Sequence, residues 1–260
     1  MRLFAIGDLH LPGADNDKAM SVFGPEWDNH FARIAEAWRA SVTPEDAVLI
    51  PGDISWAMHL EEALPDLQRI GELPGRKVMI RGNHDYWWSA IGRIRSVLPP
   101  GMTALQNDAV DLGETVVCGT RGWMIPTGET PQDPDNRRIY LREVQRLALS
   151  LDQGKRLAGN RPLVVMLHFP PLYAGERRSG FTDLMEQYQV QWCVYGHLHG
   201  NGIRAGWNGT ERGIRYRLTS CDSLNFKPLL LQEEADPPCP EAAPRLIGTT
   251  GAEMLSAGEN

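Results

Sequence analysis

Five short apolar runs in this chain each end at a segment that contains histidine, aspartate or asparagine. The runs are LFAI, AVLIP, KVMI, LVVML and WCVY, and the polar segments after them hold Asp8, Asp53, Asn83, His168 and His197. Aliphatic, β-branched runs of this length are typical of buried strands. Because open α/β sheets place their chemistry at the carboxyl ends of such strands, we expect the five segments to meet at one edge of the fold.

The histidines are concentrated in these segments. The chain has seven histidines, and five of them lie there: His10, His84, His168, His197 and His199. Imidazole nitrogen, carboxylate and amide oxygen suit Mn, Fe, Zn or Co, and no thiolate accompanies them. Residues two apart in extended chain point to the same side, so Asp8 and His10 can aim at one point, as can His197 and His199. The pattern indicates a divalent-metal site.

The charge balance of such a site would favour phosphate. If the histidines are neutral, the two carboxylates of Asp8 and Asp53 would offset only part of the positive charge of two divalent cations. An excess of about +2 would attract a phosphate and acidify a bound water. Metals about 3.5–4 Å apart can stabilise both the attacking and the leaving oxygen of an in-line displacement. Phosphoester hydrolysis is therefore the chemistry that the ligand types favour.

The order of the motifs, D-x-H, G-D, G-N-H-D, H and G-H-x-H, resembles the calcineurin-like metallophosphoesterase superfamily. The resemblance runs from Asp8 to His199 and continues to about Leu231. The stretches PGDISWAM, RGNHDYWW, GTRGW and YGHLHG resemble, more narrowly, a bacterial group of predicted phosphohydrolases. The resemblance implies an α/β fold, a four-layer α/β/β/α sandwich of two mixed sheets. Its dinuclear metal site would lie at the carboxyl ends of the strands.

The resemblance also implies a role for each motif residue. One metal would be held by Asp8, His10, Asp53 and His199. The other would be held by Asp53, Asn83, His168 and His197, with Asp53 bridging. A metal-bridging hydroxide would attack phosphorus, His84 would protonate or steady the leaving oxygen, and Arg81 would contact the phosphate. Asp85 would either orient His84 or cap the following helix. Manganese is favoured among Mn, Fe, Zn and Co.

The second motif departs from that of Ser/Thr protein phosphatases. Those enzymes read G-D-x-V-D-R-G, whereas this chain has Trp56 and Ala57 in place of the acidic residue and the arginine. The departure argues against a protein phosphatase. Arg121, in the sequence GTRGW, is a candidate replacement for the missing arginine. Trp56 and Tyr86 follow ligand motifs directly and are candidates to line the substrate pocket, although aromatic residues more often fill a core.

Periodicity predicts the rest of the α/β pattern. Amphipathic helices are expected over residues 27–42, 60–70, 89–98 and 135–151, with further strands near 103–106, 115–119, 203–207, 213–220 and 227–231. On the last helix, Arg137, Arg138, Arg142 and Arg146 are interpreted as a solvated face. We expect one domain over residues 1–231 and a flexible, Pro-, Ala-, Gly- and Glu-rich tail over residues 232–260.

Composition limits the function classes. A net charge of −7 argues against a nucleic-acid partner, because phosphate-backbone binding normally requires a basic surface. The four cysteines lack C-x-x-C spacing, so we expect reduced thiols in the cytoplasm, with Cys118 and Cys193 in the core. No apolar run approaches the length of a membrane span.

Three hypotheses of function remain open from the sequence. The favoured one is a metal-dependent phosphohydrolase that cleaves a small phosphomonoester or phosphodiester. The second is a nuclease with the same chemistry, and the third is a catalytically silent metal-binding scaffold. The scaffold hypothesis is disfavoured because no ligand is missing from the motifs. The natural substrate, the native metal and the oligomeric state are left open.

Overall fold

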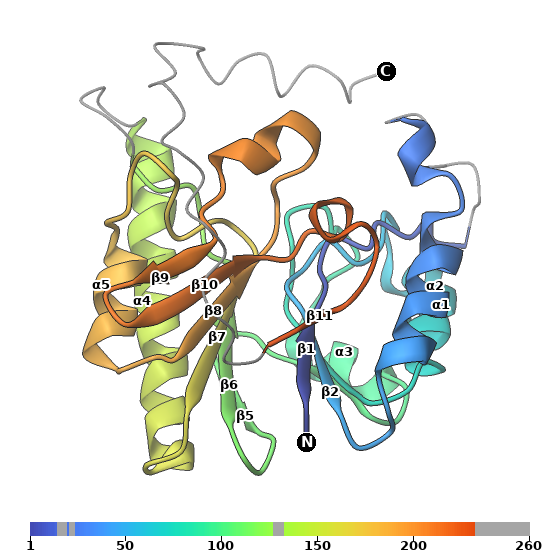
Figure 1. Ribbon diagram of the computed structural model, residues 1–260, viewed down its shortest axis with the longest axis horizontal. Helices are drawn as coiled ribbons and strands as arrows, with labels where there is room; N and C mark the ends of the chain where they lie inside the picture. Colours follow the sequence, from blue (N-terminus) through green and yellow to red (C-terminus); the bar gives the residue numbers. More distant parts are fainter. Residues whose placement is uncertain (15–19, 21–23, 127–132, 232–260) are drawn as a thin grey trace.

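Two β-sheets pack face to face, with helices on both outer surfaces (Figure 1). The computed structural model describes residues 1–14, 20, 24–126 and 133–231, and the expected tail lies outside these residues. The sheets have five and six strands, and both are mixed. This arrangement confirms the predicted α/β fold of two mixed sheets flanked by helices.

The first sheet has the order β11-β1-β2-β3-β4. Its strands are β1 (Leu3–Ala5), β2 (Ala47–Ile50), β3 (Arg76–Met79), β4 (Met102–Ala104) and β11 (Leu229–Leu230). Strands β1 to β4 are parallel, and β11 pairs with β1 in the opposite direction. The helices that follow its strands are α1 (His30–Ser41), α2 (Leu60–Gly71) and α3 (Ile91–Val97), with a 3-10 turn, η2 (Pro25–Trp27), before α1.

The second sheet has the order β5-β6-β7-β8-β10-β9. Its strands are β5 (Ala109–Asp111), β6 (Val116–Thr120), β7 (Leu163–Leu167), β8 (Trp192–Tyr195), β9 (Gly209–Glu211) and β10 (Ile214–Leu218). Strands β6, β7, β8 and β10 are parallel, whereas the two edge strands run against them. Helices α4 (Pro134–Ala158) and α5 (Gly180–Gln187) cover its outer face (Figure 1).

Alternating side chains of each strand enter different cores. In β2, Val48 and Ile50 pack towards the first set of helices, whereas Ala47 and Leu49 join the core between the sheets. In β7, Val164 and Met166 join that central core, while their neighbours pack towards α4 and α5. Because successive side chains of a strand point to opposite faces, a strand buried on both faces is apolar throughout. The continuous apolar runs of the sequence follow from this burial.

Some predicted boundaries are wrong. The strand expected at 203–207 is instead part of a 3-10 turn, η3 (Gly200–Ala205), whose local bonds include Gly206 N–H to Ile203 O at 3.0 Å. Hydrogen bonds between residues three apart use the backbone groups that a strand would need to pair with a neighbouring strand. The last long helix continues beyond residue 151, through the buried Gly154, to Ala158, and it ends at Gly159, which has a positive φ of 58°.

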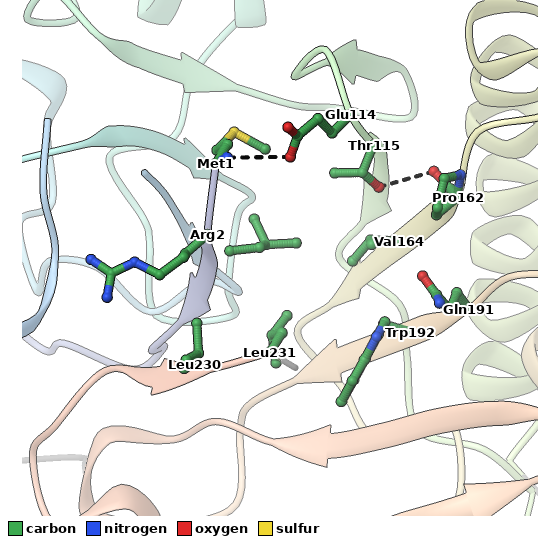
Figure 2. A pocket seen from close by; sticks show the side chains of 11 residues that line it. Met1, Arg2, Glu114, Thr115, Pro162, Val164, Gln191, Trp192, Leu230 and Leu231 are labelled. Carbon is green, nitrogen blue, oxygen red and sulfur yellow. Dashed lines mark hydrogen bonds and ion pairs between the residues drawn. The ribbon is translucent and has the colours of Figure 1, made fainter. Parts of the chain in front are cut away.

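A cavity of about 310 Å³ lies at the amino ends of the strands (Figure 2). Its lining includes Arg2 before β1, Thr115 before β6 and Gln191 before β8. An ion pair of 3.2 Å joins the Met1 ammonium to Glu114 at its rim. The histidine and aspartate segments follow the opposite ends of the same strands, so this cavity is not part of their cluster.

Candidate metal centre

The five polar segments meet at the carboxyl ends of β1, β2, β3, β7 and β8. Hydrogen bonds connect them directly: Asp8 N–H donates to Gly52 O at 2.9 Å, and His10 N–H donates to Asp53 O at 3.0 Å. Two groups of side chains are close enough to hold a cation, one made of Asp8, His10 and His199, the other of Asp8, Asp53 and His168. The meeting of strands at one sheet edge thus gathers residues as far apart as 8 and 199.

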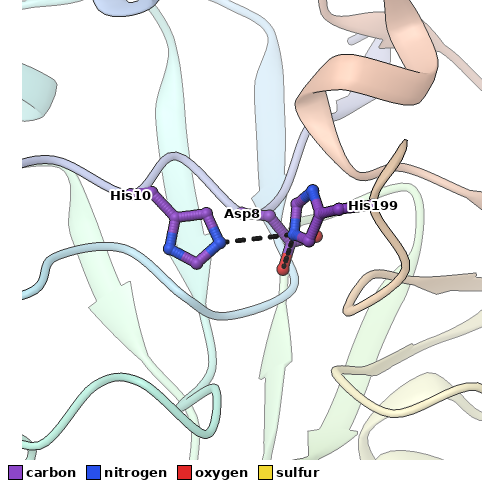
Figure 3. Close-up of side chains that lie close together, drawn as sticks. All are labelled: Asp8, His10 and His199. Carbon is purple, nitrogen blue, oxygen red and sulfur yellow. Dashed lines mark hydrogen bonds and ion pairs between the residues drawn. The ribbon is translucent and has the colours of Figure 1, made fainter. Parts of the chain in front are cut away.

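The first group is shown in Figure 3, where Asp8, His10 and His199 point at one another. Nε2 of His10 lies 3.3 Å from Nε2 of His199, which lies 3.6 Å from Oδ1 of Asp8. Asp8 is fully buried and His10 nearly so. Two nitrogens this close can share a hydrogen bond when only one of them is protonated, and with both unprotonated they could bind one cation.

His168 of the second group and His197 both approach the amide oxygen of Asn83. This Oδ1 lies 2.6 Å from Nε2 of His168 and 2.9 Å from Nδ1 of His197. The other ring nitrogen of His168 lies 3.0 Å from the carbonyl oxygen of Pro51, which fixes the orientation of the ring. With Nδ1–H donating to that carbonyl, Nε2 keeps its lone pair for a ligand.

Asp53 belongs to the second group and also lies near His10 of the first. Its Oδ2 is 3.8 Å from Nε2 of His10 and 3.6 Å from Nε2 of His168. Its other oxygen, Oδ1, accepts the backbone N–H of His84 at 2.8 Å, so the carboxylate is held in place. One oxygen of Asp53 therefore faces a histidine from each group.

The electrostatics of the site suit positive ions. Burial lowers the pKa of His168 to about 3 and that of His197 to about 4, so both rings are neutral at pH 7 and can act as ligands. Burial, together with the carboxylates of Asp85 and Asp8, raises the pKa of Asp53 well above its usual range. Cations among these side chains would relieve the repulsion between the carboxylates. The donor set and its charge states therefore fit divalent metals.

His199 differs from the other candidate ligands. Burial disfavours its charged form, but hydrogen bonds and charge attraction from Asp222 and Asp8 raise its pKa to about 10. Asp222 lies 2.9 Å from Nδ1 of His199 and also accepts the backbone N–H of Gly200 at 2.9 Å. Carboxylates of this kind orient metal-binding histidines.

The loops that carry these residues have an unusual backbone. Asp8, His10, Asp53 and His197 all have positive φ angles, between 44° and 75°. A non-glycine residue in this region costs free energy, and such strain is typical of functional sites. Two glycines of the motifs leave no room for a side chain. A Cβ at Gly82 would come closer than 3.0 Å to Asp53, and one at Gly196 would come closer than 3.0 Å to Asp8.

Asp85 has a role that the sequence did not suggest. It is fully buried, and its carboxylate accepts the backbone N–H groups of Ile54 at 2.8 Å and Gly82 at 2.7 Å. It also accepts the indole N–H of Trp87 at 3.0 Å. Helix α3 begins at Ile91 with Ala90 as its N-cap, so the capping alternative is wrong. The His84 ring is not among its hydrogen-bond partners, and Asp85 joins the loops after β2 and β3 instead.

Aromatic side chains hold His84. The Trp56 ring lies 4.3 Å from the His84 ring and stacks on the His10 ring at 5.1 Å with an interplanar angle of 24°. Tyr86 is half exposed and meets His84 edge-on at 6.1 Å. Nδ1 of His84 is buried, and no described residue forms a hydrogen bond with it. Trp56 therefore contacts both a candidate ligand and the candidate acid.

Arg81 and Arg121 approach the centre from different sheets. Arg81 follows β3 and directly precedes the Gly82-Asn83 segment. The carbonyl oxygen of Arg121 accepts the N–H of His168 at 3.0 Å, and its guanidinium lies 4.7 Å from the Trp123 ring. Both arginines are partly buried. The structure thus brings together the backbone segments of all the residues that the sequence nominated.

The sequence analysis missed two residues near the centre. Asp222, in η4 (Cys221–Leu224), contacts His199, and Cys221 donates its S–H to the carbonyl oxygen of Asp8 at 3.1 Å. Both follow β10, where the sequence carries no ligand motif. The only available signal was their position just after a strand, which many residues share.

A sequence profile described as calcineurin-like phosphoesterase matches residues 1–201 of the chain. The chain belongs to this family. Membership implies metal-dependent hydrolysis of phosphoesters, and the candidate ligand groups support binding of divalent metal. No helix in the described part of the chain is long and apolar enough to cross a membrane.

Individual proteins are similar to this phosphoesterase to different degrees. The Gene 66 protein of Mycobacterium phage D29 is 29% identical over 206 residues, which cover 76% of this chain and 78% of the phage protein. A solved protein of unknown function, AQ665 from Aquifex aeolicus, has 16% identity and a TM-score of 0.49, and covers 88% of this chain and 95% of its own. The phosphoesterase YfkN from Bacillus subtilis has 14% identity and a TM-score of 0.45, with 85% and 81% covered.

Proposed function

We propose that this chain is a two-metal phosphohydrolase that cleaves a small phosphomonoester or phosphodiester. The observation that carries the proposal is the position of Asp53, whose Oδ2 lies within 4 Å of a nitrogen of both His10 and His168. A carboxylate oxygen that faces the Nε2 atoms of two histidines has the position of a bridging ligand. Oδ1 of Asp8 also lies near His168, at 3.7 Å, but there it faces Nδ1, which is bonded to the carbonyl oxygen of Pro51. A single-metal site would not need the second group.

The ligands divide between two ions. Asp8, His10, Asp53 and His199 would hold one, and Asp53, Asn83, His168 and His197 the other. Two divalent ions at this place would supply positive charge to a phosphoryl group and lower the pKa of water. Oxygen and imidazole donors without thiolate suit Mn, Fe, Zn or Co, and manganese is the ion that we favour among them.

The remaining roles belong to His84 and Arg81. Nδ1 of His84 has no hydrogen-bond partner among the described residues, so the ring is available to bond to the leaving oxygen. Arg81 has a buried Nε without a partner in the described chain, and a guanidinium can bind two phosphate oxygens at once. We assign substrate binding to Arg81 and proton transfer to His84.

The proposed setting is the cytoplasm. Cys118, Cys193 and Cys221 are buried as free thiols, which is usual for proteins kept in a reducing compartment. Burial raises the pKa of each thiol, so none is a reactive thiolate at pH 7.

The test is hydrolysis of p-nitrophenyl phosphate and bis(p-nitrophenyl) phosphate by the Mn-loaded protein, the chelated protein and the protein with Mn restored. We expect turnover that disappears with chelation and returns with Mn. His84→Ala should bind metal like the wild type while the rate falls roughly 10²–10⁴-fold. His59→Ala, which alters an exposed histidine at the start of α2, is the matched control. Two bound metals without turnover of either ester would contradict the proposal.

A further inference from the structure

Tyr86 presents an exposed aromatic ring beside His84. The centres of the two rings are 6.1 Å apart, and the rings are nearly perpendicular, at 81°. Tyr86 is 50% exposed, whereas Trp87 and Trp88, the next two residues, are 1% and 5% exposed and belong to the core between the first sheet and its helices. The expectation that aromatic residues fill a core therefore holds for the two tryptophans but not for Tyr86.

His84 also contacts Trp56, on the loop after β2. The centres of these two rings are 4.3 Å apart. The Trp56 ring stacks on His10 as well, so it fixes His84 against a candidate ligand. His84 and Trp56 are each only partly buried. The side of the centre at His84 is thus open to solvent, and the exposed ring of Tyr86 lies on it.

The polar side chains next to these rings are used inside the protein. The buried carboxylate of Asp85 accepts backbone N–H groups from both loops. The buried hydroxyl of Ser55 donates to the carboxylate of Asp66 at 2.6 Å. An alcohol rich in hydroxyls needs a partner for each polar group that it buries, and Asp85 and Ser55 are not available to it. The surface beside His84 therefore suits an apolar ring better than a polyol.

The position of His84 relates this surface to the leaving group of a substrate. In the proposed reaction, water supplies the oxygen that joins phosphorus, the bond to the ester oxygen breaks, and the released alcohol takes up a proton beside His84. The group attached to the ester oxygen therefore lies next to the side chains that flank His84. Of these, Tyr86 has the larger exposed surface.

We propose that the leaving group of the substrate carries a flat aromatic ring, joined to the ester oxygen by a short linker, which packs against Tyr86. The inference rests on the proposed function, because it takes His84 as the residue at the leaving oxygen. Aromatic rings pack in offset or edge-to-face pairs with centres about 4.5–7 Å apart. Since the Tyr86 ring is itself 6.1 Å from His84, a ring that contacts it lies only a few bonds from the leaving oxygen.

The test compares esters whose leaving alcohols have similar acidity, so that rates report contacts and not reactivity. For the Mn-loaded, full-length protein, kcat/KM is measured with phenethyl phosphate, cyclohexylethyl phosphate and glycerol phosphate. Methyl diesters of the same alcohols replace them if bis(p-nitrophenyl) phosphate is the better substrate. We expect the phenethyl ester to be cleaved roughly tenfold or more efficiently than the glycerol ester, as contact with a ring allows. The cyclohexylethyl ester, apolar but not flat, should fall between them.

Tyr86→Ala should lose most of the preference for the phenethyl ester over the glycerol ester, and Tyr86→Phe, which keeps the ring, should retain it. Leu149→Ala is the matched control, because it removes an exposed apolar side chain, 61% exposed, from α4. The series of esters on the wild type decides the question if Tyr86→Ala does not fold.

Equal kcat/KM for the phenethyl and glycerol esters, or an unchanged preference in a folded Tyr86→Ala, would overturn the inference. Equal values for the phenethyl and cyclohexylethyl esters would show an apolar site without selection for a flat ring. Adenosine monophosphate carries its ring beyond a ribose, and its more efficient cleavage would contradict the short linker. Turnover of all esters at equal rates would leave the proposed function standing, whereas two bound metals with no turnover of any ester would contradict both.

Discussion

The carboxylate of Asp222 lies 2.9 Å from Nδ1 of His199, and the opposite ring nitrogen of His199 faces Asp8 and His10. Asp222 is itself fixed, since it accepts the backbone N–H groups of Gly200 at 2.9 Å and Ser223 at 3.0 Å. The ring of His199 is therefore oriented by a residue 23 positions later in the chain. The carboxylate sets which nitrogen of His199 is available to a metal.

Asp222→Asn should weaken metal binding without unfolding the protein. The amide keeps the shape but loses the charge that supports His199, so the metal affinity should fall roughly 10–100-fold. Calorimetric titration with Mn²⁺ measures this, and Asp111→Asn at the opposite end of the sheets is the control. Unchanged affinity in Asp222→Asn would show that the contact is only structural.

Trp56 should affect the rate through His84. Trp56→Ala removes the ring that packs on His84 and His10, so kcat should fall roughly 10–100-fold, as small misplacements of catalytic groups do. Trp56→Phe keeps a ring at this position and should recover most of the rate. The alternative, in which Trp56 lines the substrate pocket, predicts a rise in KM with kcat little changed. Steady-state kinetics at fixed metal content separates the two.

Gly82→Ala should disrupt the centre from a position that carries no ligand. Its Cβ would come closer than 3.0 Å to the carboxylate of Asp53, so we expect loss of metal and a lower melting temperature. Gly92→Ala in α3 is the control, because its Cβ would meet nothing within 4 Å and should be neutral or stabilising by up to about 1 kcal/mol. Equal metal content and melting temperature in the two variants would mean that the loops can move apart, and that the close approach of Gly82 to Asp53 is not needed.

The sequence motifs identified the candidate metal ligands, but they did not identify the residues that position those ligands and their neighbours. Asp53 and His168 lie in motifs with distinctive spacing, and the apolar runs before them define buried strands. Asp222 and Glu143 have no such motif, because a single carboxylate acquires its role only when the fold brings a histidine or arginine to it. Asp85 was recognised as special, but its bonds to the loop after β2 depend on a contact 31 residues away. Local pattern cannot predict such pairs.

Stability should fall in alkaline solution through the buried thiols. Burial raises the pKa of Cys118 from 9.0 to about 12, so the folded chain keeps a proton that the unfolded chain releases above pH 9.0. Stabilisation present below pH 9.0 is therefore lost as the pH rises towards about 12. Cys118→Ala should be less stable at pH 7 by on the order of 1 kcal/mol, with a shallower decline above about pH 9. Urea denaturation at several pH values measures the slopes, and parallel slopes would contradict this origin.

The central claim is that Asp53 serves both metals. Its Oδ2 lies 3.8 Å from Nε2 of His10 and 3.6 Å from Nε2 of His168, one from each ligand group. The most direct test is the metal content of Asp53→Asn after reconstitution with Mn²⁺ and removal of excess ion, with wild type and Asp111→Asn measured in parallel. We predict two equivalents in the wild type and the control, and loss from both positions in Asp53→Asn. Two full equivalents with normal turnover in Asp53→Asn would contradict the bridging role.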